Sequence, residues 1–230
     1  SRLANPASSG GGRLFRNDLS IGPDGARVLR FTDVTRQSGI VTPGYGMGVE
    51  PADDDNDGWV DLYLTKFDAP NQLFRNNGDG TFSDVSKSSG TDHRSWSVSA
   101  SFADDNGDGW LVLYVGNYIR YSLESNTPCF GVSGALDYCM PAAYQPLQDR
   151  LYINQSGKTF VDASAKSGIA SEYGPALGVS TADFNGDGWM DIYVANDGKE
   201  NQLWINKRDG TFENTALLSG VALPVSGKAE

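Results

Sequence analysis

Aspartates in three short stretches are the residues of this chain best suited to chemistry. The stretches read ADDDNDGWVDLYL (52–64), ADDNGDGWLVLYV (103–115) and ADFNGDGWMDIYV (182–194). Oxygen ligands at alternate positions of a tight loop can converge on one hard cation, and Ca²⁺ prefers roughly six to eight of them. A solvated acidic turn is the alternative interpretation. Three copies of one spacing favour a cation site in each loop.

The three stretches align position by position from their first aspartate. We expect side-chain ligands at positions 1, 3, 5 and 9, a backbone carbonyl ligand at position 7, and glycine at position 6 for the sharp turn. In the first loop, Asp54 and Asn56 are then bystanders that point outward. The candidate metal ligands are Asp53, Asp55, Asp57, Trp59 and Asp61 in the first loop, Asp104, Asn106, Asp108 and Trp110 in the second, and Asp183, Asn185, Asp187, Trp189 and Asp191 in the third.

The spacing differs from that of an EF-hand, which needs a carboxylate at position 12 and flanking helices. Position 12 is Leu64, Val115 or Val194, so EF-hand and dockerin-type loops are excluded. The second loop also lacks a carboxylate at position 9, where it has Val112. Side-chain charge is therefore -4 in the first loop, -3 in the third and -2 in the second. We predict calcium affinity in that order, with the second site the weakest, either empty or completed by water.

The segments around the loops indicate β-structure. Each loop follows a stretch rich in small residues (GYGMGVEP, WSVSASF or GPALGVST) and precedes a run that is apolar on both faces. Such runs are typical of strands between two packed layers. A second motif recurs at 13–18, 72–86, 150–164 and 202–216, with turns such as NNGDG that indicate hairpins. Without helical periodicity, four strands per repeat of roughly 50 residues predict an all-β fold of β-propeller-type blades.

These repeats also predict how the chain is organised. We expect a flexible segment at 1–12, one repeat domain at 13–221 and a tail at 222–230. Within the domain we expect a leading hairpin (13–40), repeats at about 44–90, 95–169 and 174–221, and an insertion at 118–148. The opening SRLANPASSGGG has no Met, which suggests a processed product or an excised piece. No apolar run reaches the roughly 18 residues of a transmembrane helix.

The blade count bears on partners. Three repeats and a hairpin are fewer than the roughly four to eight blades that close a propeller. Either the chain is a fragment of a longer propeller, or the leading hairpin completes the last blade or that of a neighbouring molecule. Unpaired blade edges would bind copies of this chain, giving a ring or a filament, or other extracellular proteins.

Cysteine usage bears on the compartment. Cys129 and Cys139 lie in the insertion and predict a disulfide, which is typical of secreted, extracellular or periplasmic proteins. Two unpaired thiols in a reducing compartment are the alternative. The triplet NQS at 154–156 matches a glycosylation sequon, which matters only in a eukaryotic secretory setting.

Charge and histidine content argue against several classes of function. The net charge of -11 argues against a nucleic-acid surface, and a single histidine, His93, argues against a histidine-based catalytic or zinc site. We predict a non-enzymatic extracellular module with a structural, adhesion or self-assembly role. A carbohydrate-binding, lectin-like propeller is the alternative. In that case sugars would stack on tyrosines of the insertion, which are Tyr118, Tyr121, Tyr138 and Tyr144. The other interpretation is that these tyrosines only pack the insertion against the core.

The repeated motif resembles a known family. Three copies of D-x-[DN]-x-D-G-x-x-[D/V] between strands are similar to the FG-GAP/VCBS repeats of integrin-α-type β-propellers. The stretches LFRNNGDGTFSDVS and YCMPAAYQPLQDRLY resemble more narrowly the ASPIC/UnbV group of cartilage acidic protein-type repeats. The resemblance covers about residues 13–221. It implies that Ca²⁺ is held by positions 1, 3, 5, 7 and 9 of loops between blade strands. An enzymatic function is a third hypothesis, which rests only on analogy with larger proteins of the family.

Overall fold

Three antiparallel sheets of four strands each form the body of the protein. The computed structural model describes residues 11–122, 124 and 126–223, so most of the predicted segment 1–12 and of the predicted tail 222–230 lie outside the described residues. The all-β prediction is confirmed. The sheets consist of β5 (Tyr45–Ala52), β6 (Asp61–Phe67), β8 (Gln72–Asn76) and β9 (Phe82–Asp84); of β11 (Ser97–Ala103), β12 (Val112–Asn117), β15 (Arg150–Asn154) and β16 (Phe160–Asp162); and of β17 (Ala176–Ala182), β18 (Asp191–Asn196), β19 (Gln202–Asn206) and β20 (Phe212–Asn214).

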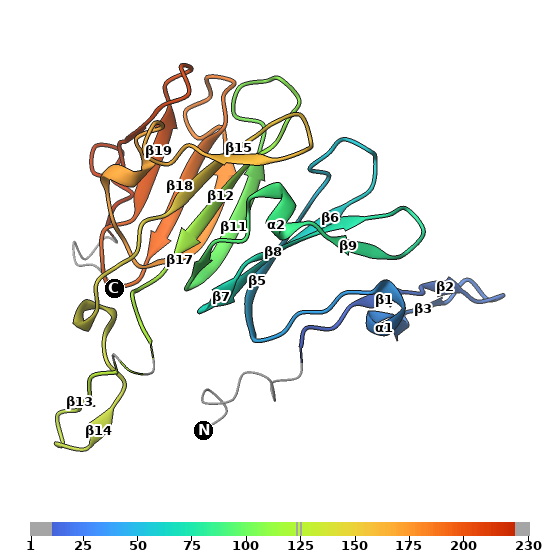
Figure 1. Cartoon of the computed structure of the whole chain (residues 1–230), viewed down its shortest axis with the longest axis horizontal. Coiled ribbons are helices and arrows are strands. Elements are labelled where there is room, and N and C mark those ends of the chain that lie inside the picture. The colour runs from blue at the N-terminus through green and yellow to red at the C-terminus, as the bar shows by residue number, and fades with distance from the viewer. Residues whose placement is uncertain (1–10, 123, 125, 224–230) are drawn as a thin grey trace.

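Within each sheet, consecutive strands are hydrogen-bonded neighbours. Figure 1 shows the three sheets side by side in chain order, and over the part of the chain that is described they form an open row rather than a closed ring. We call them the first, second and third blades. Each first strand shifts register against its neighbour at the same place, between Gly46 and Gly48, Ser97 and Ser99, or Ala176 and Gly178.

The small residues of the first strands allow the blades to approach closely. β11 lies against both β5 and β17. A Cβ atom added to Gly48 would lie 2.5 Å from the carbonyl oxygen of Val98, closer than any real contact. The Thr65 hydroxyl donates to that same oxygen at 2.8 Å. The predicted small-residue strands therefore form the line along which the blades meet.

Two apolar clusters hold the blades together. One lies between the first and second blades and includes Tyr63, Leu73 and Leu113. The other lies between the second and third blades and includes Tyr114 and Trp204. Burying one such side chain contributes about 1.5–3 kcal/mol, so these clusters dominate the stability of the row.

Two short helices were missed by the sequence interpretation: α1 (Thr35–Ser38) and α2 (Ser86–Ser89). Each is a single turn after the outermost strand of its hairpin. Asp33 Oδ1 accepts from the Thr35 amide at 3.0 Å, and Gly39 ends α1 in the left-handed region (φ 73°). Local hydrogen bonds and left-handed glycines of this kind stabilise turns too short to show helical periodicity. The described residues also form two 3₁₀ turns: η3 (Pro141–Ala143) and η4 (Ile169–Ser171).

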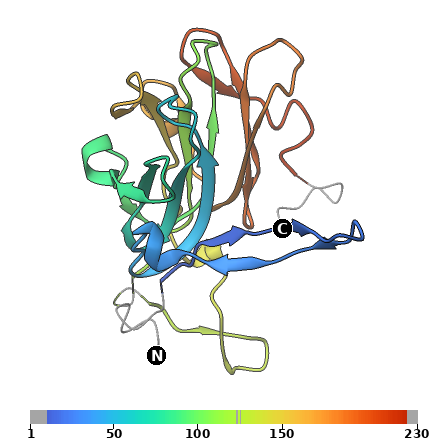
Figure 2. The ribbon, with the colours of Figure 1, turned by 90° about the vertical axis from the view of Figure 1, so that its right-hand side faces the viewer.

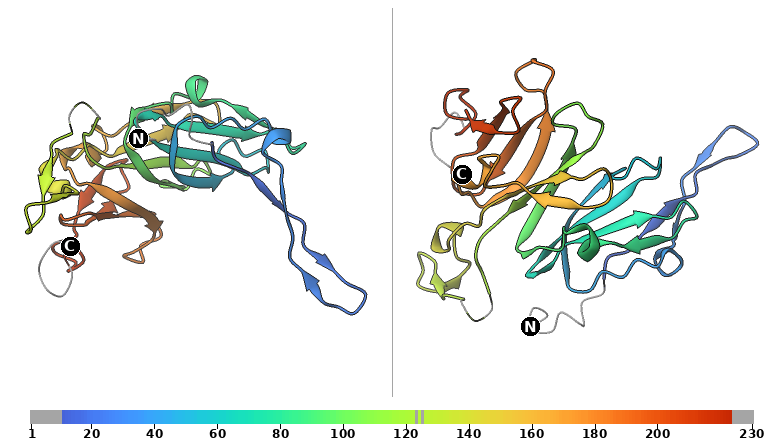
Figure 3. Two further views of the ribbon diagram at one scale, coloured as in Figure 1. Left: turned by 90° about the horizontal axis from the view of Figure 1, so that it is seen from below. Right: turned by 45° about the horizontal axis from the view of Figure 1, so that its top comes forward.

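The leading hairpin stands apart from the blades. β1 (Phe15–Asn17) pairs with β4 (Phe31–Asp33), and β2 (Ser20–Ile21) pairs with β3 (Arg27–Val28). Figures 2 and 3 show this blue ribbon extending away from the sheets. It forms its own two-stranded ladders, so it does not complete the third blade of this chain.

The insertion carries the predicted disulfide. Cys129 and Cys139 are bonded, with their Cα atoms 5.2 Å apart, beside the small hairpin of β13 (Cys129–Phe130) and β14 (Leu136–Asp137). An isolated bridge between Ile119 and Pro146 closes the base of the insertion. A last ladder, of β7 (Ala69–Pro70) and β10 (Arg94–Ser95), links the first blade to the chain entering the second. In the described parts of the chain, no helix has the length and apolar character to cross a membrane.

Candidate metal centre

Each acidic loop joins the first and second strands of a blade, so all three loops lie at one edge of the row. The loops follow Ala52, Ala103 and Ala182, which end β5, β11 and β17. The first and second loops are in contact, because the Asn56 amide donates to the Gly109 carbonyl at 2.9 Å.

The first aspartate of each loop folds the backbone around its carboxylate. Asp53 accepts from the amides of Asp57 at 3.1 Å and Gly58 at 2.9 Å. Asp104 and Asp183 accept in the same way from the glycine at position 6 of their loops, at 3.0 and 2.8 Å. That glycine has φ of 90°, 85° and 87° in the three loops, in the left-handed region that glycine tolerates best. The prediction of glycine for the sharp turn is thus confirmed.

Three of the predicted ligands converge in the first loop. Asp53, Asp55 and Asp61 each place a carboxylate oxygen within 4.8 Å of the other two. Asp55 Oδ1 is buried and has no hydrogen-bond partner in the described structure. Burial raises the pKa of Asp55 and raises that of Asp61 to about 7. A cation would satisfy the orphaned oxygen and relieve the crowding, so this cluster fits Ca²⁺. Asp57, whose Oδ1 accepts from the Trp59 amide at 2.8 Å, is not part of the cluster.

The aspartate at position 9 also fastens the loop to the hairpin of its blade. Asp61 accepts from the amides of Asp54 at 3.0 Å and Asn76 at 2.8 Å. Asp191 repeats the pattern in the third loop, with amide donors on Phe184 and Asn206 at 3.0 and 2.9 Å. The second loop has Val112 at this position and cannot form the link.

The prediction that Asp54 points outward is wrong. Its side chain is fully buried and forms an ion pair with Arg75 Nη2 at 3.0 Å, while Arg75 Nε lies 3.3 Å from Asp55. Arg75 also donates to the Gly157 carbonyl in the second blade. The positive charge of Arg75, on β8, offsets the desolvation cost of burying the Asp54 carboxylate. The sequence did contain one signal for this burial: Arg75 stands on β8 at the position where the matching strands have Ile153 and Ile205.

Asn56 is exposed, as expected of a bystander, although its amide bridges two loops. Its φ of 58° lies in the left-handed region, which the other two loops reach with Gly107 and Gly186. Position 4 therefore needs a residue that tolerates positive φ, and asparagine is one of the few.

In the third loop, the carboxylate of Asp187 already has polar partners. Arg208 Nη2 lies 2.9 Å from Asp187 Oδ2, and the Asn185 amide donates to the same oxygen at 3.1 Å. The hydrogen bond from Arg208 lowers the pKa of Asp187. Among the residues described, only the first loop gathers three acidic groups within 4.8 Å, and the third does not.

The second loop is the least complete of the three. Only Asp104 and Asp108 supply carboxylates at the predicted positions, and the Asn106 amide donates to Asp108 Oδ2 at 3.0 Å. Asp105 beside them is buried, and its burial raises its pKa to about 6.

Comparison of the sequence with models of protein families identifies a family for this chain. The sequence model of the FG-GAP-like repeat matches residues 53–115, 134–194 and 183–227, and two of these matches begin at the first aspartate of a loop. The chain belongs to the FG-GAP-like repeat family. The prediction of β-propeller-type blades is thereby confirmed.

This FG-GAP chain is similar to curated proteins named cartilage acidic protein 1. The Homo sapiens protein is 31% identical over 78% of this chain and 23% of its own length. The Xenopus tropicalis protein is 32% identical over 44% of this chain and 16% of its length. The Mus musculus protein is 23% identical over 78% of this chain and 32% of its length. The chain thus spans at most about a third of the relatives it matches.

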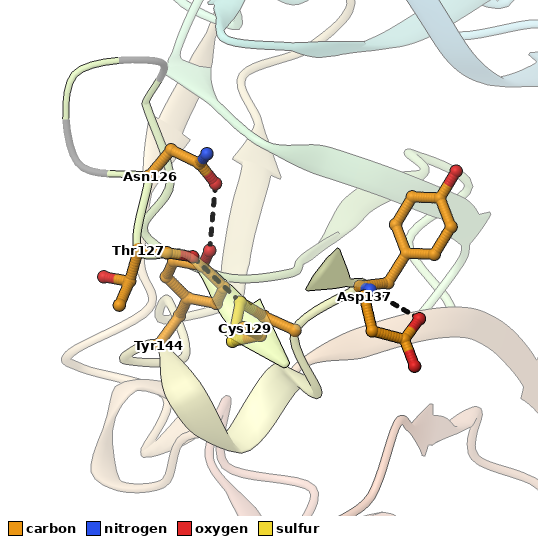
Figure 4. Close-up of a disulfide and its surroundings, with 7 residues drawn as sticks. Asn126, Thr127, Cys129, Asp137 and Tyr144 are labelled. Carbon is orange, nitrogen blue, oxygen red and sulfur yellow. Dashed lines mark hydrogen bonds between the residues drawn. A yellow bond between two sulfur atoms is a disulfide. The ribbon is translucent and has the colours of Figure 1, made fainter. Parts of the chain in front are cut away.

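The tyrosines of the insertion gather away from the FG-GAP loops. Tyr118, Tyr121, Tyr138 and Tyr144 line a hollow of about 810 Å³ beside the disulfide, where Figure 4 shows Tyr144 next to Asn126. Three of them pack against other rings. The Tyr121 and Tyr144 ring centroids lie 5.5 Å apart, and those of Trp96 and Tyr118 lie 4.9 Å apart. Tyr138 is 97% exposed, so packing accounts for the other three and not for it.

Proposed function

We propose that this chain is a calcium-stabilised, non-enzymatic module of an extracellular or periplasmic FG-GAP repeat protein. The observation that carries the proposal is the convergence of Asp53, Asp55 and Asp61, with a buried and unpartnered oxygen on Asp55. The same loop recurs at the same edge of each blade. The proposal is for up to three Ca²⁺ ions, one to a loop, with the middle site the weakest.

The residues that would hold the ion are those of the sequence prediction. In the first loop these are Asp53, Asp55, Asp57 and Asp61, with the backbone carbonyl of Trp59. Bound calcium would supply positive charge among carboxylates that otherwise repel one another. Because Asp61 also accepts from the Asn76 amide, a fixed loop would hold the β5–β6 connection onto the hairpin of its blade.

Two further features support the proposed compartment and the proposed role. A disulfide in an exposed insertion supports a secreted or periplasmic setting. The outer side of the first blade supports adhesion or self-assembly, with other extracellular proteins or copies of this chain as partners. Val49 on β5 is 60% exposed, whereas Ala100 and Val179, at the matching positions of β11 and β17, belong to the clusters between blades.

Thermal melting with and without the metal tests the proposal. Calcium at about 100 times its dissociation constant adds roughly 2.7 kcal/mol to the free energy of unfolding. For a domain of this size, the midpoint should therefore fall by about 5–10 °C in EDTA. Magnesium at equal concentration is the control and should restore less of the loss. A melting curve that is the same in EDTA and in calcium would refute structural calcium.

A further inference from the structure

A hollow of about 420 Å³ lies at the edge of the blades opposite the acidic loops. Asp68, at its rim, follows the far end of β6, and Arg150 begins β15, the strand whose other end contacts the first loop. Arg94 and Arg120 join Arg150 in its lining. In a chain with a net charge of -11, this is a local concentration of positive charge.

The arginines of this hollow are incompletely neutralised. Arg94 pairs with Asp68 at 3.1 Å, and Arg150 pairs with Asp162, which lies outside the lining. Arg150 Nε is buried and donates to no acceptor in the described structure. Arg120 is exposed and forms no ion pair with any described residue. Asp68 is the one acidic residue of the lining as described, and it already pairs with Arg94, so the exposed guanidinium of Arg120 is available to bind an anion.

Aromatic rings line the same hollow. Trp96 and Tyr121 form part of its wall and also border the larger hollow beneath the disulfide. Tyr173 is 52% exposed, and its hydroxyl accepts from the Gln148 amide at 2.8 Å. Aromatic rings with an apolar face and a polar edge suit ligands that are themselves amphipathic.

We propose that this hollow binds a saccharide that carries a carboxylate. The guanidinium groups of Arg120 and Arg150 would bind the carboxylate, and the rings of Tyr121 and Tyr173 would contact the sugar. The volume is within the range of pockets for small ligands. Inorganic anions and acidic peptides would satisfy the arginines without using the rings. The site shares no residue with the acidic loops, so this inference is independent of the calcium proposal.

Isothermal titration calorimetry on the whole chain tests the site, with D-glucuronate as the probe. D-glucose tests the need for charge, and sulfate tests charge without a ring. We expect glucuronate to bind at least tenfold more tightly than either. R120Q should weaken glucuronate binding at least tenfold, because it removes the guanidinium that forms no ion pair within the described part of the chain. Y173A should weaken glucuronate and leave sulfate unchanged.

The matched control is R27Q, which removes an exposed arginine from the leading hairpin. It should bind glucuronate as the unaltered chain does, and melting curves should show that every variant is folded. The proposal would be overturned if glucuronate did not bind, or if sulfate bound equally well or polyglutamate bound more tightly. It would also be overturned if R120Q bound glucuronate as the unaltered chain does. A chain that fails to bind glucuronate but still melts at a lower temperature in EDTA than in calcium would lose this site and keep the calcium proposal, which separates the two failures.

Discussion

The side chain of Asn154 crosses from the second blade to the first, where its Nδ2 donates to the backbone carbonyl of Asp54 at 2.8 Å. Asn206 repeats this contact one blade later, with the carbonyl of Asp105 as acceptor at 2.7 Å. Both asparagines are buried at the end of the third strand of their blade. The candidate metal loops are thus fastened to the next blade through their backbones.

We predict that N154A lowers the free energy of unfolding more than N76A does. Asn76 occupies the matching position of the first blade and donates to Val60 of its own loop. Both asparagines also accept from an amide of their own turn, so the comparison cancels that contribution. We expect a difference of about 1 kcal/mol, the usual contribution of one hydrogen bond with a buried acceptor. Urea unfolding measures it, and equal losses in the two variants would contradict the prediction.

Much of this arrangement was visible in the sequence. The small-residue strands, the apolar strands after each loop and the glycine at position 6 repeat three times, and local rules connect each pattern to a conformation. The disulfide followed from two cysteines in one insertion. Local patterns therefore predicted the blades and the folding of each loop around its first aspartate.

Contacts between distant residues were not predictable in this way. Asp54 is a neighbour of the candidate ligands in sequence, yet its burial depends on Arg75 from another strand. Asn154 recurs in the sequence as Asn76 and Asn206 of the repeated motif, but nothing in that pattern shows that its buried amide reaches the neighbouring blade. The partners of such side chains are set by how the strands assemble, which a single sequence does not display.

Calcium affinity should differ among the loops in the order first, third, second. The first loop gathers three carboxylates, and the second lacks a carboxylate at position 9. Affinity increases with the number of charged ligands and with the rigidity of the site. Calorimetric titration of D53N, D104N and D183N measures each contribution. The tightest binding step should disappear in D53N, and its loss in D104N instead would disprove the order.

Removing Arg208 should strengthen the third site. Its guanidinium lies 2.9 Å from Asp187 Oδ2 and competes with a cation for that carboxylate. The pair is partly exposed, so we expect only a two- to fivefold gain in affinity for R208Q, about the range of a surface ion pair. K207Q is the control, because Lys207 is its neighbour and pairs with Glu213 instead. Both are best titrated in a D53N/D104N background, where a gain shared by K207Q would exclude direct competition.

Asp149 should make stability depend on pH near neutrality. It is buried within the second blade, where it accepts from the Tyr114 hydroxyl at 2.8 Å and the Asn117 amide at 2.7 Å. Burial raises the pKa of its carboxyl to about 7. Between about pH 4 and 7 the folded chain therefore keeps a proton that the unfolded chain has released. The stabilisation is complete below about pH 4 and is lost as the pH rises through 7.

Urea unfolding at pH 5.5 and 7.5, in EDTA to remove metal, measures this dependence. Between pH 5.5 and pH 7.5, the free energy of unfolding of the unaltered chain should fall by about 1–2 kcal/mol more than that of D149N. The reason is that the amide of D149N cannot ionise. D24N, in the exposed turn of the leading hairpin, is the control and should follow the unaltered chain. The other acidic groups are common to all three proteins, so their titration cancels in the comparison. Parallel stability profiles for the unaltered chain and D149N would show that Asp149 does not titrate in this range.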